Sequence, residues 1–220
     1  MLSTSSNQAT FIGCLHATNT DSAPYDHWIL ENPLDDEVIE ALLDLPFEVP
    51  KVDCSDGRRE AYNSTRRFFD PAVLDEFEVC KMVAETMQSQ ETVSVIQDTC
   101  GVDLKGSSLR IEYVMDRDEF WLEPHTDIGA KRFTMLIYLS PDPESDTWGT
   151  DIYEGPGPET YLATVPFKSN RGLIFLPGED TWHGFRKRPI NGIRRALIVN
   201  YVSDEWRARH ELCFPESPIS

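Results

Sequence analysis

A histidine and a carboxylate stand two residues apart in the segment Pro124-His125-Thr126-Asp127. The residues before this segment alternate as in a β-strand, and residues i and i+2 of a strand point to the same face of its sheet. His125 and Asp127 can therefore aim at one point in space. A second histidine arriving there would complete a 2-His-1-carboxylate triad, which holds Fe(II) on one side and leaves the other side open.

The candidate for that second histidine is His183, in the segment Thr181–Phe185. It follows the apolar run Gly172–Leu176 by one turn, which places it on a neighbouring strand of an antiparallel β-fold. Taken alone, His183 is better interpreted as a core or edge histidine. The His125–Asp127 pair alone also has a plain alternative, a strand-end histidine followed by a solvated loop aspartate.

Two adjacent arginines, Arg194 and Arg195, interrupt the hydrophobic segment Gly192–Val199. A charge in an apolar strand must find a partner. For a guanidinium the natural partner is a carboxylate that accepts two parallel hydrogen bonds. Since neighbouring strand residues face opposite ways, one of the two is a surface arginine on a half-exposed strand.

The first half of the chain has helical patterns. Residues 50–67 are charged and predict a loop. Proline at the first helical position and glycine just after the last turn mark helix ends. The predicted helices run from about Asp35 to Leu45, from Asp70-Pro71 through about Met87, and from Glu91 to Thr99 before Gly101.

The chain changes character near residue 107, where short segments rich in β-branched and aromatic residues alternate with Pro- and Gly-rich turns. Regularly spaced strands with turn signals indicate a sandwich or barrel, and helices followed by strands indicate a helical layer on a β-fold. The predicted strands are Ser108–Met115, Arg132–Leu139, Thr150–Tyr153, Thr160–Ala163, Gly172–Leu176, Trp182–Arg186 and Ile193–Val202.

A length of 220 residues suits one domain with a substantial core. We expect residues 1–24 to form a flexible arm or an edge strand, and residues 25–220 to form a single domain. Within that domain, we expect a helical layer over 33–106, a β-core over 107–202 and a tail over 203–220 that begins with a short helix.

The composition excludes several classes of protein. Twenty basic residues against 38 acidic ones give a net charge of −18, which argues against a nucleic-acid partner. The five cysteines form no C-x-x-C pair and their number is odd, so neither a disulfide framework nor a zinc site is indicated. Free thiols, no signal-peptide pattern and no apolar run of membrane-spanning length lead us to expect a cytoplasmic protein without a membrane partner.

Together these motifs resemble the 2-oxoglutarate- and Fe(II)-dependent dioxygenases, most closely their prolyl-hydroxylase-like branch. The resemblance rests on His-x-Asp, a second histidine some tens of residues later, and a Gly-x-Arg whose arginine lies eleven residues beyond it. Arg132–Leu139 looks like the strand after the first ligands. Trp148–Ile152 looks like the family's Gly-Gly strand start, with Thr150 in place of the second glycine. The resemblance covers most of residues 25–202.

This resemblance implies a mainly β fold with N-terminal helices, in which a double-stranded β-helix forms a jelly-roll, cupin-like core. It also implies roles for individual residues. Ordinary core packing is as good an interpretation for the two tyrosines. The implied roles are iron ligation by His125, Asp127 and His183; binding of the distal carboxylate of 2-oxoglutarate by Arg194, with Arg195 as the runner-up; and co-substrate contacts from Tyr138, Thr134 and Tyr113.

The implied reaction uses Fe(II), O2 and 2-oxoglutarate, releases succinate and CO2, and hydroxylates an unactivated C–H bond of a small molecule or an amino-acid side chain. Asp127 favours hydroxylation over halogenation, because related halogenases usually lack this carboxylate; desaturation and ring closure stay open. The alternatives are a cupin-like metal protein with another reaction and a non-catalytic binding module on the same fold. Arg194 argues against the first and the complete triad against the second. The substrate and the oligomeric state are not readable from the sequence.

Overall fold

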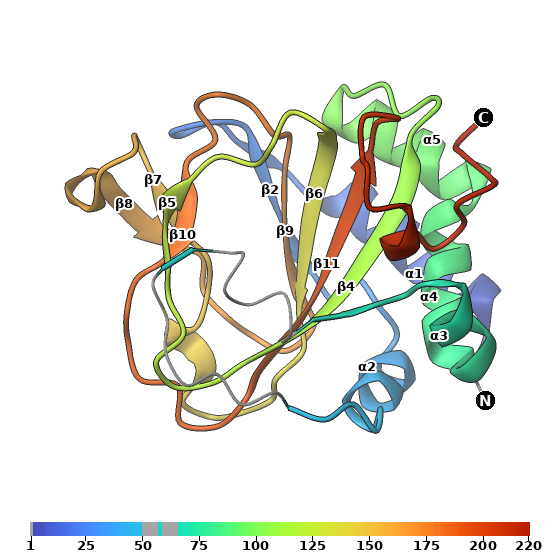
Figure 1. Ribbon diagram of the computed structural model, residues 1–220, viewed down its shortest axis with the longest axis horizontal. Coiled ribbons are helices and arrows are strands. Elements are labelled where there is room, and N and C mark those ends of the chain that lie inside the picture. Colours follow the sequence, from blue (N-terminus) through green and yellow to red (C-terminus); the bar gives the residue numbers. More distant parts are fainter. Residues whose placement is uncertain (1, 50–56, 59–65) are drawn as a thin grey trace.

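Two antiparallel β-sheets lie against each other in the computed structural model, which describes residues 2–49, 57–58 and 66–220 (Figure 1). The larger sheet has seven strands in the order β1-β2-β9-β6-β11-β4-β3, and the smaller has four in the order β5-β10-β7-β8. This is the jelly-roll-type architecture that the sequence predicts. Most of the predicted loop over 50–67 lies outside the described residues. Its predicted C-terminal boundary is wrong, because strand β3 already begins at Arg66.

All seven predicted strands are confirmed to within one residue at each end. The larger sheet consists of β1 (Thr20–Asp21), β2 (His27–Glu31), β9 (Arg171–Phe175), β6 (Lys131–Tyr138), β11 (Arg194–Val202), β4 (Ser108–Asp116) and β3 (Arg66–Phe68). The smaller sheet consists of β5 (Leu122–His125), β10 (His183–Phe185), β7 (Asp151–Tyr153) and β8 (Tyr161–Thr164).

Five helices cover the outer face of the larger sheet in the described part of the chain (Figure 1). Their ends follow local signals: the Asp70 carboxylate accepts from the Val73 amide ahead of Pro71, and Gly101 ends its helix in the left-handed conformation. The helices are α1 (Thr4–Ala17), α2 (Asp36–Leu43), α3 (Pro71–Glu76), α4 (Glu78–Gln88) and α5 (Gln90–Cys100).

The larger sheet has two cores, one on each face. Side chains on the outer face, such as Ile111 and Val199, join the apolar cluster under the helices. Those on the inner face, such as Val114 and Ala196, join a smaller cluster between the two sheets. Because alternate residues of a strand point to opposite faces, every residue of β4 is buried on one side or the other. The inner space is where the site lies.

Residues 1–24, expected to form a flexible arm or an edge strand, are mostly helical. The segment forms α1, which ends at Ala17, followed by the two-residue edge strand β1. Phe11 and Leu15 are fully buried in the outer core, and the amide of Asn7 donates to Thr86 on α4. The Ser- and Thr-rich composition masks the helix, because tertiary packing rather than propensity stabilises it.

The C-terminal tail also differs from the prediction. In place of a short helix through Leu212, the chain makes turns and a single 3-10 turn at Arg209–Glu211. Leu212 bridges to Arg110 of β4, and the buried Ile219 donates its amide to the carbonyl of Ser107. The tail therefore braces the start of β4. No helix in the described ranges is long and apolar enough to cross a membrane.

Candidate active site

Three side chains with metal-binding chemistry converge between the sheets. His125 ends β5 and His183 begins β10, and the two are direct partners in the antiparallel pairing of these strands. Asp127 follows His125 by two residues. One ligand atom from each residue lies within 4.8 Å of the other two. The structure thus brings together the three residues that the sequence singles out.

Both histidine rings are oriented by the backbone. Nδ1 of His125 lies 2.8 Å from the carbonyl oxygen of Glu123, and Nδ1 of His183 lies 2.9 Å from that of Thr181. A carbonyl only accepts, so each Nδ1 carries the proton and each Nε2 keeps its lone pair for a metal. Burial, with His125 close by, lowers the pKa of His183 to about 3, so the ring is neutral at physiological pH.

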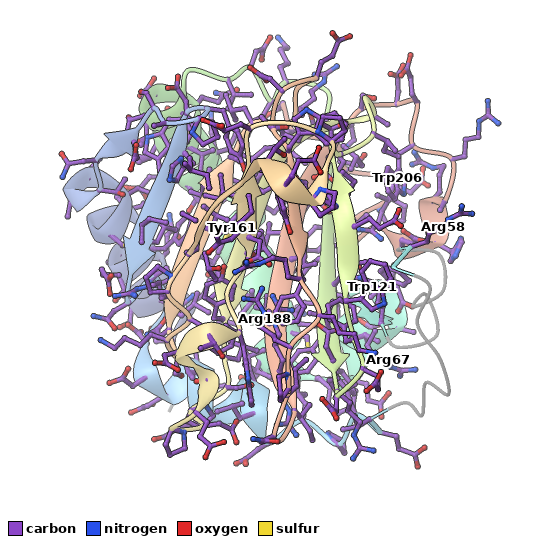
Figure 2. All side chains as sticks on the ribbon, turned by 90° about the vertical axis from the view of Figure 1, so that its left-hand side faces the viewer. Arg58, Arg67, Trp121, Tyr161, Arg188 and Trp206 are labelled. Atoms are coloured by element: carbon purple, nitrogen blue, oxygen red, sulfur yellow. The ribbon has the colours of Figure 1, made fainter. Side chains whose placement is uncertain are left out.

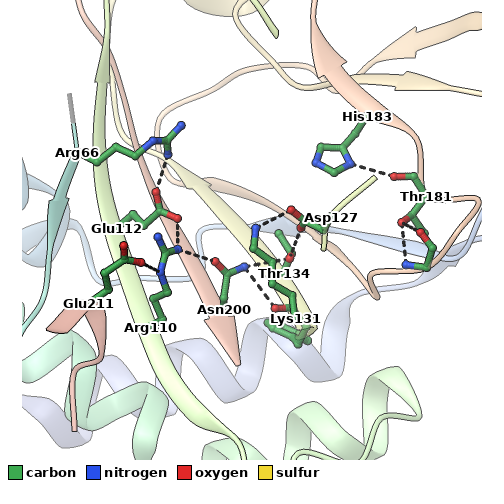
Figure 3. A network of polar contacts seen from close by, with 12 residues as sticks. Arg66, Arg110, Glu112, Asp127, Lys131, Thr134, Thr181, His183, Asn200 and Glu211 are labelled. Atoms are coloured by element: carbon green, nitrogen blue, oxygen red, sulfur yellow. Dashed lines mark hydrogen bonds and ion pairs between the residues drawn. The ribbon is translucent and has the colours of Figure 1, made fainter. Parts of the chain in front are cut away.

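Two donors hold the third candidate ligand. Nζ of Lys131 lies 2.5 Å from Oδ1 of Asp127, and the hydroxyl of Thr134 donates to Oδ2 at 2.7 Å (Figure 3). Lys131 is 4% exposed, so its charge is effective in a largely water-free setting. The carboxylate is therefore fixed in orientation, and part of its negative charge is balanced.

A chain of polar contacts continues from Thr134 to the edge of the sheet (Figure 3). The amide of Asn200 donates to the Thr134 hydroxyl and accepts from the guanidinium of Arg110. Arg110 is paired with Glu112 and Glu211. Glu112 also pairs with Arg66 of β3 at 2.6 Å. Buried charges must be paired, and here the pairs fix the inner faces of β3, β4 and β11 relative to one another.

A cavity of about 60 Å³, partly open to solvent, extends from the three candidate ligands into the space between the sheets. Its lining is apolar around Phe185, Phe120 and Leu136 and charged at Arg194 and Asp116. Other lining residues include Arg66, Val114, Leu122, Lys131, Thr134, Thr150, Gly184 and Ile198.

Arg194 and Arg195 lie on opposite faces of β11. Arg194 is 5% exposed and lines the cavity, whereas Arg195 lies on the outer face near Tyr113. The Arg194 guanidinium donates from Nε to the carbonyl of Trp148 and from Nη1 to Oδ2 of Asp116, each at 2.6 Å. Of the two arginines, Arg194 is thus the one placed to meet a ligand.

The predicted co-substrate residues have different environments. Tyr138 is fully buried between the sheets and stacks on Phe167; its hydroxyl donates to the side chain of Thr150 and accepts from the Thr150 amide. Thr150 lines the cavity, whereas Tyr138 lies behind it and is not among the lining residues. Gly149 must be glycine, because a Cβ there would lie 1.6 Å from the carbonyl oxygen of Val165.

Tyr113 does not belong to the site. It lies on the outer face of β4, where its hydroxyl donates to the carbonyl of Leu42 and its ring contacts Phe47 edge-on. The prediction of a co-substrate contact is wrong, because strand alternation turns Tyr113 toward the helices.

Sequence reasoning missed Asp116, Lys131 and Thr150 as site residues. The sequence held a signal for Thr150, which replaces a glycine in a strand start. It held none for Lys131, since strand alternation would put residues 131 and 134 on opposite faces and the pairing of β6 with β11 is irregular there. Asp116 gave none, because it lies 78 residues from Arg194 and only the pairing of β4 with β11 brings the two together.

A second hollow, of about 390 Å³, meets the candidate ligands from the solvent side. His125, Asp127 and Lys131 line both spaces. The outer wall includes Trp206, whose ring lies 4.6 Å from the Arg110 guanidinium. Figure 2 shows Trp206, Trp121 and Arg58 gathered on one side of the molecule. This hollow gives a molecule from solvent access to the candidate metal position.

No protein-family model and no curated protein matches the sequence. Solved structures do match. A prolyl hydroxylase from Trichoplax adhaerens, in complex with a peptide fragment of the hypoxia inducible factor oxygen degradation domain, is 15% identical with a TM-score of 0.57, over 93% of both chains. A prolyl 4-hydroxylase from Phytophthora capsici is 11% identical with a TM-score of 0.61, over 94% of this chain and 68% of its own. The chain shares their fold.

HygX from Streptomyces hygroscopicus, solved with nickel and 2-oxoglutarate bound, has the same fold at 13% identity and a TM-score of 0.52, over 82% of this chain and 83% of its own. The resemblance to the prolyl-hydroxylase-like branch is therefore confirmed at the level of the fold.

Proposed function

We propose that this protein is a non-haem Fe(II)- and 2-oxoglutarate-dependent dioxygenase that hydroxylates an organic substrate and releases succinate and CO2. The observation that carries the proposal is the meeting of His125, Asp127 and His183 at one end of an internal cavity that also holds the buried Arg194. A metal site and a carboxylate anchor in one cavity are what a reaction between an oxo acid and oxygen requires.

The donor set fits a ferrous ion. Two neutral imidazoles and one carboxylate on one side of a metal are the ligands of non-haem Fe(II) oxygenases, and they leave positions open. When bound, the iron supplies the oxidising chemistry that couples decarboxylation of the oxo acid to hydroxylation. His125 and His183 would bind through Nε2, since each Nδ1 is held by a backbone carbonyl.

The remaining residues of the cavity have supporting tasks. Lys131 and Thr134 fix the orientation of Asp127 through its two oxygens. Arg194, with Thr150 and Tyr138 behind it, would bind the distal carboxylate of 2-oxoglutarate. Phe120 and Phe185 lie with their ring centroids 5.4 Å apart and make the wall apolar, which excludes water from the reacting groups.

The organic substrate would approach through the outer hollow lined by Trp206 and Arg110. Its aromatic and charged lining suits a substrate that carries both polar and apolar groups. Solved proteins of this fold include one in complex with a peptide fragment and an epimerase from nogalamycin biosynthesis. Either an amino-acid side chain or a small molecule is therefore a reasonable class of substrate.

One observation favours a second candidate, a metal protein that does not use 2-oxoglutarate. Arg194 already has a carboxylate partner, Asp116, inside the protein. If that ion pair satisfied Arg194 completely, the cavity would hold no anchor for a dicarboxylic acid, and the same three ligands would serve another reaction.

Anaerobic titration separates the two candidates. The protein is loaded with Fe(II) without oxygen and titrated with 2-oxoglutarate while the metal-to-ligand absorption band is followed. A saturable band, followed by succinate release when oxygen and a panel of substrates are admitted, is the expected result. Tight Fe(II) binding with no response to 2-oxoglutarate would favour the second candidate, and no metal binding would refute both.

A further inference from the structure

An oxygen of Asp116 has no hydrogen-bond partner among the described residues, although it is buried. Asp116 ends β4 opposite Arg194 of β11, lines the cavity and is 3% exposed. Its Oδ2 accepts from Arg194 at 2.6 Å, whereas its Oδ1 accepts from nothing in the described chain. Buried carboxylate oxygens are nearly always satisfied. An unsatisfied one in the wall of the cavity that begins at the candidate metal ligands indicates a contact that a ligand completes.

The charges around Asp116 come from three strands. Arg194 on β11 is in direct contact, Arg66 on β3 is close enough to act through space, and Glu112 lies two residues away on β4 itself. Glu112 is bonded to Arg66 and Arg110, so these arginines are already paired. Burial raises the pKa of Asp116, while Arg194 and Arg66 oppose the rise. The balance leaves this carboxyl group ready to take up a proton when another negative charge approaches.

A dicarboxylic co-substrate would bring that charge. The two contacts of Arg194 use Nε and Nη1, which leaves Nη2 for a ligand carboxylate beside Asp116. The two carboxylates would lie side by side on one guanidinium. Glu112 has two arginine partners, whereas this pair would have direct contact with Arg194 alone, so in a site with little water it would hold one proton between its two members.

We propose that Asp116 is a binding residue for the co-substrate, which it recognises by sharing one proton with the distal carboxyl group, so that binding takes up a proton from solvent. The inference rests on the proposed function. Arg194 is already paired with Asp116, which would otherwise compete with the co-substrate for this arginine. With a shared proton, Asp116 instead helps Arg194 to bind the co-substrate. No bond other than the O–H bond is formed or broken.

The test is calorimetric titration of the Fe(II)-loaded protein with 2-oxoglutarate, without oxygen, in buffers of different ionisation enthalpy between pH 6 and 9. We expect uptake of about one proton per molecule bound at the upper end of this range. Affinity should fall about tenfold per pH unit there, as linkage requires for one proton gained on binding. A 2-oxo acid without the distal carboxyl group, 2-oxobutanoate, should bind more weakly and without proton uptake.

Asp116→Asn supplies the matched variant, because it keeps the shape and an acceptor for Arg194 but cannot ionise. Its affinity for 2-oxoglutarate should not change with pH, and at pH 8.5 it should exceed that of the unmodified protein by about tenfold or more. The proton count is made on the unmodified protein, so it does not depend on the folding of the variant.

The possible results distinguish a failure of this inference from a failure of the proposed function. Binding of 2-oxoglutarate without proton uptake, with the same affinity from pH 6 to 9, would overturn this inference and leave the proposed function standing. Weaker binding by Asp116→Asn at every pH would also overturn it, since the carboxylate would then be needed in its charged form. No binding of 2-oxoglutarate at any pH would refute the proposed function itself.

Discussion

Along strand β4, Leu109, Ile111 and Tyr113 face the helices, whereas Glu112 and Asp116 face the space between the sheets. Both sets are buried, yet one is apolar and the other is charged. The apolar face contributes free energy of folding by removing its surface from water. The charged face must pair every group that it buries, and such pairs contribute little net stability. The comparison indicates that one strand supports the fold on one side and positions the chemistry on the other.

The largest effect is expected at the candidate metal ligands on the inner side. His183→Ala should abolish Fe(II) binding and turnover of 2-oxoglutarate while leaving the helical layer folded, because the outer core does not contact this ring. Equilibrium metal titration and circular dichroism measure the two effects. His210→Ala, at an exposed histidine, is the matched control and should behave like the unmodified protein. Full metal affinity in His183→Ala would show that the triad assignment is wrong.

The outer face should respond in the opposite way. Ile111→Ala removes three buried carbon atoms beneath the helices and should lower the free energy of unfolding by about 2–5 kcal/mol. Urea denaturation of the metal-free protein measures this loss. Metal affinity of the folded variant should stay the same, so a drop there would show that the two faces are coupled.

Arg194 and Arg195 are adjacent on β11 but lie on its inner and outer faces, so the two faces can be compared at neighbouring residues. Arg194→Ala removes one partner of a buried charge pair, which typically costs about 2–5 kcal/mol, and should weaken 2-oxoglutarate binding roughly thirty-fold or more. Arg195→Ala, on the outer face, should change it little. The absorption titration without oxygen measures both, and Fe(II) should still bind in each. A larger effect from Arg195→Ala would reverse the assignment of the faces.

A smaller effect is expected one step away from the metal. Thr134→Val keeps the shape of the side chain but removes the hydroxyl that donates to Asp127, and such partners of ligands are worth about 10–100-fold in metal affinity. We expect about tenfold weaker Fe(II) binding by competition with a chelating dye. Thr134→Ser restores the donor and should restore most of the affinity; if it did not, the methyl group rather than the hydrogen bond would matter.

The smallest effect is expected at Tyr113. Tyr113→Phe removes one buried hydrogen bond to the Leu42 carbonyl and should cost about 1 kcal/mol of stability. It should leave 2-oxoglutarate affinity unchanged, because the hydroxyl lies on the helical side. Parallel denaturation and binding curves check both statements. A clear loss of affinity would return Tyr113 to the site.

The sequence predicts the strands well because each has a short apolar run bounded by Pro- or Gly-rich turns, and these signals are local. His125, Asp127 and His183 are predictable for a similar reason, since strand periodicity and chain order are enough to bring them together. The Gly-x-Arg motif favours Arg194 over its neighbour Arg195 as the residue that faces the cavity. The burial of Arg194 agrees with this prediction.

Other features depend on contacts that no local pattern encodes. The pairing of Asp116 with Arg194 follows from the register of β4 against β11. Strand alternation separates Tyr113 from Glu112 and Asp116, but only the packing of β4 between the helices and the smaller sheet decides which set faces the helices. Helix α1 was missed since its polar composition conceals the few residues, Phe11 and Leu15 among them, that dock it on the outer core.

The stacking of Arg110 on Trp206 has a practical consequence. The indole lines the hollow next to His125 and Asp127, so a molecule that fills this hollow changes the water and the charges around the ring. Indole emission is sensitive to both. A variant in which the other four tryptophans are replaced by phenylalanine would therefore act as an unlabelled optical sensor, suited to screening compound libraries in plates before any turnover assay has been established.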